Sequence, residues 1–266
     1  MARLQDKRLF LLDMDGTIYL DDRLFDGVTA FLERIREKGG RYLFLTNNSS
    51  RGVEDYIKRL AGMGIDAGRE DFLTSVDAAI DHLQRLYPGR RCYVQGTRSF
   101  YDQLAAAGID VTCDREGGAD ILLSGFDREL TFRKLEDACI LLGRGVTWLA
   151  TNPDWVCPTW YGSVPDCGSV CEMLTRATGR RPEFLGKPKP AMAELALRRT
   201  GYPAEAAAVI GDRIYTDIAC AVNAGIDSIF VLSGEGTRED IETYGIRPTW
   251  VYDDINAVFR AWEDEL

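Results

Sequence analysis

The sequence predicts an α/β protein whose core is a mostly parallel sheet. Short apolar runs rich in Leu, Ile, Val and aromatic residues alternate along the chain with segments of helical periodicity, which is the pattern of such a sheet. Several of these runs end in residues with carboxylate, hydroxyl or amide side chains. The length of 266 residues corresponds to one large domain or two moderate ones, at about 100 to 200 residues per domain.

The first part of the chain predicts a βαβα unit. Residues 9–12 are continuously apolar and predict a buried strand, and residues 42–45 predict a second one. Between them, apolar residues at positions 28, 31, 32 and 35 have the spacing of an amphipathic helix, which should end at the glycine pair 39–40. The same spacing returns over residues 53–60, after a polar loop. The predicted order is therefore strand, helix, strand, helix.

The middle and the end of the chain repeat this alternation. In the middle block, which would have its own core, we expect strands over residues 92–94, 121–123 and 146–150 and helices over 100–106 and 132–142. A third block begins near residue 184. It predicts a helix after residue 190, a strand at 207–210, a helix near 218–222, a strand at 228–232, a short strand near Trp250 and a terminal helix up to Trp262. The pair Thr-Asn closes two of the predicted strands, at 46–47 and 151–152, an echo that we take as coincidental.

The composition argues against several classes of partner. The chain has 32 Lys and Arg against 42 Asp and Glu, a formal net charge of −10, which argues against a nucleic-acid polymer or an anionic membrane surface. A small anionic substrate remains compatible, because a metal ion or a local positive cluster overrides the global field. No apolar run approaches the roughly 18 residues of a membrane span, and the first one is too short for a signal peptide. With seven scattered cysteines and no CxxC pair, we expect a cytoplasmic protein with reduced thiols.

A pair of acidic residues follows the first predicted strand. Asp13 and Asp15 stand two residues apart before a glycine, at the strand end where ligands bind in open α/β sheets. Two carboxylates this close repel each other, so their presence indicates a shared proton or a divalent cation. For a set of oxygen ligands, Mg²⁺ is the natural ion. The alternative is that the two acids only cap the following element.

Three further segments place polar side chains where a ligand could bind. Thr46 and Asn47 close the second predicted strand, where a hydroxyl, an amide and backbone N–H groups can hold an anion, although the same residues are common helix caps. Lys187 lies between a glycine and a proline, which could hold its ammonium in one place; alone it would be a solvated surface lysine. Asp212 and Asp217 occupy a strand-to-helix turn, where two acids can also be a cap and a dipole partner.

Taken together, these motifs are far more specific than their members. Asp-x-Asp-Gly-Thr at residues 13–17, Thr-Asn at 46–47, Gly-Lys-Pro at 186–188 and Gly-Asp-x-x-x-Thr-Asp at 211–217 occur in this order. The ordered set resembles the haloacid dehalogenase (HAD) superfamily. The large block between the second and third motifs, which contains Thr-Asn-Pro-Asp at 151–154, is similar to the NagD-like, p-nitrophenylphosphatase branch.

The resemblance implies both an architecture and a reaction. It implies a Rossmann-like, HAD-like catalytic core of residues 1–78 and 184–266, with an α/β cap domain of residues 79–183 inserted between the second and third motifs. The implied enzyme is a Mg²⁺-dependent phosphatase that hydrolyses small phosphomonoesters through an aspartyl-phosphate. Asp13 would be the nucleophile, and Asp15 would be the general acid for the leaving group and then the base for water.

The same resemblance implies roles for the remaining motif residues, none of which departs from the family pattern. The side chains of Asp13 and Asp212 and the main-chain oxygen of Asp15 would hold Mg²⁺. Thr46, Asn47 and Lys187 would hold the phosphoryl group. Asp217 would orient Lys187 or a metal-bound water. These groups matter because a carboxylate that approaches a dianionic phosphate meets a like-charge barrier, which positive charge lowers.

Substrate specificity is expected in the cap, because the core motifs contact only the phosphoryl group. Residues 152–169 are loop-rich and aromatic. We expect Asp166 to hydrogen-bond to hydroxyls of the leaving group and Trp160 or Tyr161 to stack on a ring. The alternative is that the aromatic residues pack the core of the cap and that Asp166 caps the following helix.

Other functions compete with a phosphatase. A phosphomutase or phosphonatase of the same superfamily would share the motifs. A receiver-like phospho-accepting module also uses strand-end Asp, Thr and Lys around Mg²⁺, but it would hold a stable aspartyl-phosphate without turnover, and the acid at Asp15 counts against it. The sequence leaves open whether the substrate is a sugar phosphate, glycerol phosphate, a nucleotide, pyridoxal phosphate or a p-nitrophenyl phosphate type of ester. An exposed cap surface would allow a homodimer.

Overall fold

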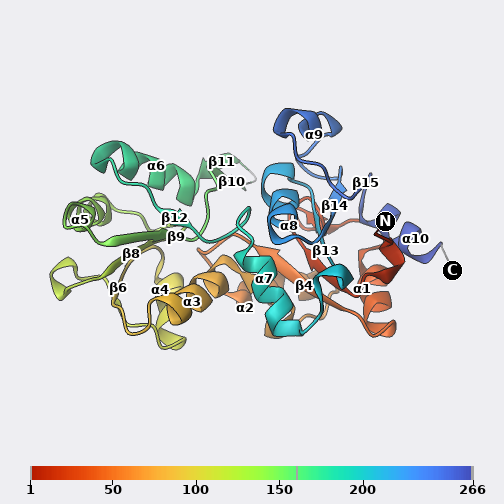
Figure 1. The fold of residues 1–266 in the computed structure, drawn as a ribbon, viewed down its shortest axis with the longest axis horizontal. Helices are drawn as coiled ribbons and strands as arrows, with labels where there is room; N and C mark the ends of the chain where they lie inside the picture. Colours follow the sequence, from red (N-terminus) through yellow and green to blue (C-terminus); the bar gives the residue numbers. More distant parts are fainter. Residues whose placement is uncertain (1, 160, 265–266) are drawn as a thin grey trace. The chain divides into compact units, whose positions relative to one another are not determined.

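The computed structural model describes residues 2–159 and 161–264, and the chain forms two compact units (Figure 1). The first unit comprises Met1–Thr46, Val53–Leu73 and Lys187–Leu266, and the second comprises Asn47–Gly52 and Thr74–Gly186. Within the described residues, no helix has the length and apolar character that crossing a membrane requires.

The first unit is built around a six-stranded sheet with the order β15-β14-β13-β1-β4-β5. Its strands are β1 (Leu9–Leu12), β4 (Arg41–Thr46), β5 (Phe72–Thr74), β13 (Ala207–Gly211), β14 (Asp227–Val231) and β15 (Trp250–Tyr252). The pairs that β1 makes with β4 and β13 are parallel, as are those of β14 with β13 and β15. Strands β1, β4, β13 and β14 are apolar and buried almost throughout, as expected for a parallel sheet with both faces covered.

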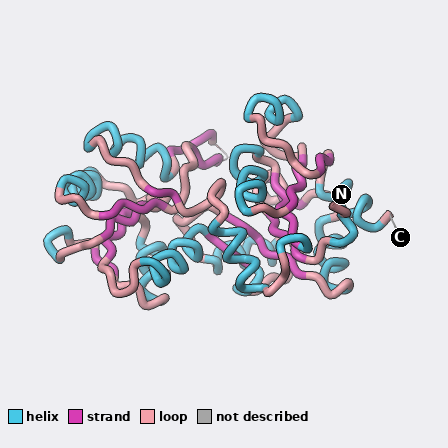
Figure 2. The backbone as a smooth tube through the Cα atoms, viewed as in Figure 1, coloured by secondary structure: helices cyan, strands magenta, loops and turns pink. Residues whose placement is uncertain are grey.

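Helices cover the two faces of this sheet (Figure 2). They are α1 (Val28–Glu37), α2 (Val53–Gly62), α7 (Ala191–Thr200), α8 (Ala219–Ala224), α9 (Arg238–Tyr244) and α10 (Ile255–Glu263). The core on one face includes a triangle of aromatic rings from β1, α1 and α10, in which Phe10, Phe31 and Trp262 have centroids 5.2 to 5.6 Å apart. This packing anchors β1 at the centre of the sheet. A short antiparallel pair, β2 (Tyr19–Leu20) and β3 (Arg23–Leu24), follows β1.

The second unit contains a five-stranded sheet with the order β12-β9-β8-β6-β7. Its strands are β6 (Cys92–Gln95), β7 (Val111–Thr112), β8 (Ile121–Ser124), β9 (Thr147–Ala150) and β12 (Glu183–Phe184). Apolar side chains of α3 (Ser75–Leu86) and α4 (Arg98–Ala106) belong to the cluster on one face. Those of α5 (Phe132–Gly143) and α6 (Cys167–Thr178) belong to the cluster on the other face.

The stretch expected to be loop-rich contains regular structure. Strands β10 (Val156–Thr159) and β11 (Gly162–Pro165) form a two-stranded antiparallel sheet. Its strands are only partly buried, with alternating exposed and half-buried residues in β10. The sequence analysis did not predict these strands, because each has only four residues and each contains a proline, Pro158 in β10 and Pro165 in β11.

The structural boundaries between the units differ from the predicted ones. The second unit begins at Thr74 rather than at residue 79, because Thr74 caps α3 by accepting a hydrogen bond from the Asp77 backbone. Val76, Ala79 and Leu83 of that helix then pack in one cluster with strands of the second unit. At the other boundary the unit extends to Gly186, whose backbone N–H donates to the Thr151 carbonyl at 2.7 Å.

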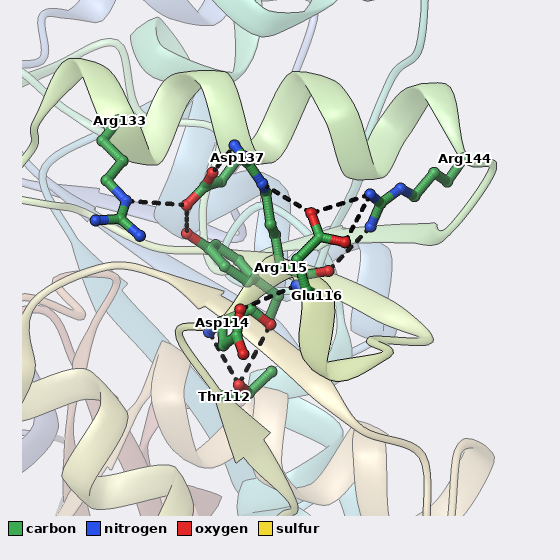
Figure 3. Close-up of polar contacts among 8 residues, drawn as sticks. Thr112, Asp114, Arg115, Glu116, Arg133, Asp137 and Arg144 are labelled. Atoms are coloured by element: carbon green, nitrogen blue, oxygen red, sulfur yellow. Dashed lines mark hydrogen bonds and ion pairs between the residues drawn. The ribbon is translucent and has the colours of Figure 1, made fainter.

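An ionic network in the second unit joins the short 3₁₀ helix Arg115–Gly117 to α5 (Figure 3). The buried Asp137 carboxylate accepts hydrogen bonds from the Tyr93 hydroxyl at 3.0 Å and from Arg115 at 2.8 Å. Arg115 also bonds to Glu116, which in turn accepts hydrogen bonds from Arg144. A buried carboxylate needs such partners to offset its lost hydration, so we assign this network to the stability of the second unit.

Candidate active site

Two carboxylates meet at the carboxyl edge of the first unit's sheet because their strands are neighbours. Asp13 follows β1 directly, and Asp212 follows β13. The two strands are paired in parallel with Leu12 opposite Ile210, and the Asp13 backbone N–H donates to the Ile210 carbonyl at 2.9 Å. A third carboxylate comes from Asp217, in the helical turn that follows β13. Oxygen atoms of Asp13, Asp212 and Asp217 lie within 4.8 Å of one another.

Lys187 supplies the positive charge of this cluster. Its Nζ lies 2.5 Å from an oxygen of Asp13 and 2.6 Å from an oxygen of Asp217, and the residue is 3% exposed. Burial lowers the pKa of the Lys187 ammonium, but the charges of Asp13 and Asp217 outweigh it, so this pKa lies above its ordinary value. Burial also raises the pKa of Asp13 well above its ordinary value, and the charge of Asp217 adds to the effect.

Hydrogen bonding distinguishes the two other carboxylates. Asp217 uses one oxygen for Lys187 and accepts a hydrogen bond from the Arg213 backbone N–H with the other, at 3.2 Å. Asp212 accepts a hydrogen bond from the Glu235 backbone with Oδ2, at 2.7 Å, but its buried Oδ1 has no hydrogen-bond partner among the described residues. Burial raises the pKa of Asp212 to about 6, together with the charge of Asp217.

These carboxylates suit a divalent cation. Three ionised carboxylates and one ammonium leave an excess negative charge in a buried place, which a bound cation would neutralise. The orphaned Oδ1 of Asp212 is the kind of buried polar atom that requires a partner. Because both oxygens of Asp217 already accept hydrogen bonds, Asp13 and Asp212 are the side chains with the capacity to hold the ion. The donors are all oxygen, which favours Mg²⁺ or Ca²⁺ over softer ions.

The structure places Asp15 outside this cluster. Its side chain is 67% exposed, and one carboxylate oxygen lies 3.7 Å from Nη1 of Arg59 in α2. The residue precedes a turn at Gly16, where φ is +82°. A side chain on Gly16 would also overlap the Asp212 carboxylate, so glycine is required there for two reasons. Asp15 therefore lies at the surface of the same unit, two residues beyond Asp13.

The second motif divides between the two units. Thr46 is the last residue of β4, next to β1 in the first unit, and is 9% exposed. Asn47 belongs to the second unit, where its Nδ2 donates to Asp154 at 3.0 Å. The Asn47 carbonyl accepts hydrogen bonds from Asn152 Nδ2 at 2.8 Å and from Ser75 Oγ at 2.6 Å. The two Thr-Asn pairs are therefore in contact, through the hydrogen bond from Asn152 to the Asn47 carbonyl.

The structure describes two of the three candidates for specificity. Asp166 is 4% exposed and caps α6, accepting a hydrogen bond from the Cys167 backbone at 2.5 Å. This is the helix-capping arrangement that the sequence left as an alternative. Tyr161 is 58% exposed, so its ring lies at the surface of the second unit. Trp160 lies outside the described residues.

Comparison with known proteins agrees with the motifs and the fold. Residues 10–110 match the family described as Haloacid dehalogenase-like hydrolase, and residues 184–258 match a second family of HAD-like hydrolases. An acid sugar phosphatase of Staphylococcus aureus is 32% identical over 260 residues, which cover 98% of this chain and 100% of the relative. The chain belongs to the haloacid dehalogenase-like hydrolases.

Solved structures place this HAD hydrolase in the NagD-like, p-nitrophenylphosphatase group. A 4-nitrophenylphosphatase from Thermotoga maritima has a TM-score of 0.92 and 39% identity, covering 98% of this chain and 99% of that one. A glycerol phosphate phosphatase from Mycobacterium tuberculosis, in complex with magnesium, has a TM-score of 0.89 and 32% identity. That alignment covers 97% of this chain and 78% of the other. The same protein is also known in complex with calcium.

Sequence analysis missed a loop that orients the Asp212 side chain of this HAD hydrolase. After β14, the Glu235 and Gly236 backbone N–H groups donate to the carboxylate and the carbonyl of Asp212, at 2.7 and 3.0 Å. The Ser233 hydroxyl donates to the Gly16 carbonyl at 2.7 Å. The loop thus links both acidic motifs. The only local signal was the sequence Ser-Gly-Glu-Gly after an apolar run, which also describes an ordinary turn.

Gly234→Ala is expected to weaken Mg²⁺ binding by at least about tenfold, since displaced supporting groups typically cost 10- to 100-fold in metal affinity. A Cβ at this position would overlap the carboxylate of Asp212 and displace it. Isothermal titration of the metal-free protein with Mg²⁺ measures the change. Gly62→Ala is the matched control, because a Cβ there meets no atom within 4 Å. Equal Mg²⁺ affinities in the two variants would show that this loop does not orient Asp212.

Proposed function

We propose that this phosphatase hydrolyses small phosphomonoesters with Mg²⁺ as its metal ion and Asp13 as its nucleophile. The observation that carries the proposal is the buried cluster in which Lys187 bridges Asp13 and Asp217 beside the orphaned oxygen of Asp212. A phosphoryl group that enters such a site meets an ammonium and a metal ion rather than carboxylates alone. Their charge lowers the barrier to attack by an anionic nucleophile.

The proposed reaction has two steps on this chain's residues. An Asp13 oxygen forms a bond to phosphorus while the bond from phosphorus to the ester oxygen breaks. The ester oxygen leaves with the bonding electron pair and takes the proton of the Asp15 carboxyl group. Asp15, now a carboxylate, then accepts a proton from the water that attacks the aspartyl-phosphate, which releases phosphate and restores Asp13.

The residues around Asp13 have separate proposed tasks. The side chains of Asp13 and Asp212 and the main-chain oxygen of Asp15 would hold Mg²⁺, which supplies positive charge to the phosphoryl oxygens when bound. Lys187 stays protonated beside Asp13 and contributes a second positive charge. Asp217 holds the Lys187 ammonium in position, in agreement with its 2.6 Å contact.

Thr46 and Asn47 are proposed to bind the phosphoryl oxygens. An asparagine amide has two N–H donors. Asn47 directs one hydrogen bond of its Nδ2 to Asp154, which would fix the plane of the amide for the second donor. In this proposal Asp154 and Asn152 act through Asn47 and do not contact the substrate.

The substrates are proposed to be sugar phosphates, glycerol phosphate or similar small esters. This proposal is supported by the names of the relatives, which are acid sugar phosphatase, glycerol phosphate phosphatase and 4-nitrophenylphosphatase. Nucleotides and pyridoxal phosphate belong in the same test. Tyr161, being exposed on the second unit, is proposed to contact the leaving group. A homodimer and a cytoplasmic location stay predictions; none of the seven cysteines is in a disulfide, which is compatible with a reducing compartment.

Phosphate release from a panel of small phosphomonoesters tests the proposal. We expect turnover with Mg²⁺, loss of turnover in excess EDTA, and recovery when Mg²⁺ is restored. Mg²⁺ should also raise the melting temperature of the protein, because a ligand bound only to the folded state stabilises it. Asp212→Asn should abolish that rise, whereas Asp26→Asn, at an exposed carboxylate, should retain it.

Three results would contradict the proposal. Turnover that is indifferent to EDTA would exclude the metal. A stable phosphoenzyme formed from acetyl phosphate without release of phosphate would favour the receiver-like module. Transfer of phosphate within a sugar, rather than to water, would favour a phosphomutase.

A further inference from the structure

Arg59 of α2 lies outside the four motifs, but its side chain makes several contacts with the segment that follows Asp13. Its guanidinium carbon lies 4.3 Å from the centroid of the Tyr19 ring, and Nη1 donates to the Tyr19 hydroxyl at 3.3 Å. Nη2 donates to the Asp21 carbonyl at 2.6 Å. Ion pairs join Nη1 to Asp15 at 3.7 Å and Nε to Asp22 at 3.6 Å. One side chain therefore contacts four residues of a single short segment.

That segment runs from Asp15 through β2 to the turn before β3. The Gly16 backbone N–H donates to the Tyr19 carbonyl at 2.8 Å, and Asp15 and Tyr19 form an isolated β-bridge. Tyr19 itself is fully buried. In the turn after β2, Asp21 has a positive φ of 51°, a backbone conformation that residues other than glycine rarely adopt. Arg59 thus contacts both ends of β2, through the Tyr19 side chain at its start and the Asp21 carbonyl just after it.

The geometry of Arg59 suits positioning better than charge neutralisation alone. At 3.7 Å and with Asp15 67% exposed, the ion pair is too loose and too solvated to contribute much stability. The planar guanidinium, in contrast, is held by ring stacking and by two hydrogen bonds, so its orientation is fixed. A cation held in this way beside Asp15 favours those positions of its carboxylate that face Arg59.

We propose that Arg59 is a positioning residue that holds Asp15 in the orientation from which it protonates the leaving group. The inference rests on the proposed function, in which the ester oxygen takes the proton of Asp15 as the bond to phosphorus breaks. An alkoxide is a strong base and leaves slowly without that proton. A p-nitrophenolate is a weak base and leaves readily as the anion. Misplacing Asp15 should therefore slow the formation of the aspartyl-phosphate from alkyl esters more than from p-nitrophenyl phosphate.

The experiment compares two substrates across matched variants. We would measure kcat/KM for glycerol phosphate, or for the best alkyl ester of the panel, and for p-nitrophenyl phosphate. This constant reports the steps up to formation of the aspartyl-phosphate and not its hydrolysis, in which Asp15 acts alike for both substrates. Arg59→Gln should lower kcat/KM for the alkyl ester by about tenfold or more, a part of the 10²- to 10⁴-fold that general acid catalysis supplies. It should change kcat/KM for p-nitrophenyl phosphate by less than about threefold, since that leaving group does not depend on the proton.

Two further variants and one control complete the test. Arg59→Lys keeps the charge but not the fork of donors, and should recover only part of the alkyl-ester rate. Tyr19→Phe removes the hydroxyl that Arg59 contacts and should shift the ratio of the two rates in the same direction by a smaller factor. Lys58→Gln changes the neighbouring, exposed cation of α2 and should leave both rates unchanged. Melting curves of all variants show whether each is folded; if Arg59→Gln is unstable, the Lys and Phe variants decide.

A loss of kcat/KM of equal size for both substrates would overturn the assignment, because it would indicate a structural role. An unchanged ratio, or a faster alkyl ester, would overturn it as well. These results are distinguishable from failure of the proposed function. If the proposed function is wrong, the unsubstituted enzyme will turn over neither ester, and the assignment of Arg59 will be wrong as well.

Discussion

Asp13→Asn is expected to lower kcat by at least about 10⁴-fold, as removal of a covalent nucleophile does in other hydrolases. An amide oxygen is a poor nucleophile toward phosphorus, so no aspartyl-phosphate can form. The fold should persist, because Lys187 keeps its contact with Asp217 and because a buried carboxylate with a raised pKa is replaced by a neutral group. Rapid-quench labelling with a radiolabelled substrate measures the phosphoenzyme directly.

The matched control for this variant is Asp26→Asn, at an exposed position. It should retain both turnover and labelling. If Asp13→Asn kept more than a few per cent of the activity, or if peptide mapping found the phosphoryl group on another residue, Asp13 would not be the nucleophile.

Lys187→Met is expected to have the largest combined effect on stability and activity. The substitution keeps most of the side-chain volume but leaves Asp13 and Asp217 without the cation that now lies 2.5 and 2.6 Å from them. Removing one partner of a buried ion pair typically costs about 3–5 kcal/mol, and losing one charge aimed at the transition state costs about 10²- to 10³-fold in kcat. Urea unfolding without metal gives the first quantity and steady-state kinetics with saturating Mg²⁺ gives the second.

Lys189→Met provides the control, since Lys189 stands two residues further along and is exposed. It should change neither quantity appreciably. Mg²⁺ should recover part of the stability of Lys187→Met, because a cation at Asp13 and Asp212 replaces some of the missing charge. A variant as stable as the control, in the absence of metal, would mean that the two carboxylates do not depend on Lys187.

Most helices and strands were predictable because their signal is local. The continuous apolar run of β1 and the helical spacing in α1 coincide with the structure to within two residues. The hairpin of β10 and β11 was not predictable, since its strands are short and only partly buried. The boundary expected at residue 79 also differs from the start of the second unit at Thr74, because the assignment of α3 to that unit depends on packing with β6 and α4 rather than on its own sequence.

The sequence alone was enough to predict which side chains gather at this edge of the sheet. Asp13, Lys187, Asp212 and Asp217 each stand in a short motif at a strand end or a helix start, and parallel strands bring such ends to one edge of the sheet. Their contacts were known only from the fold: Lys187 lies between Asp13 and Asp217, and one oxygen of Asp212 has no hydrogen-bond partner among the described residues. The residues that hydrogen-bond to Asp212 and Asn47, and the one that forms an ion pair with Asp15, were also known only from the structure. Such contacts join segments far apart in the chain, and no local pattern encodes the distance between two side chains that meet only after folding.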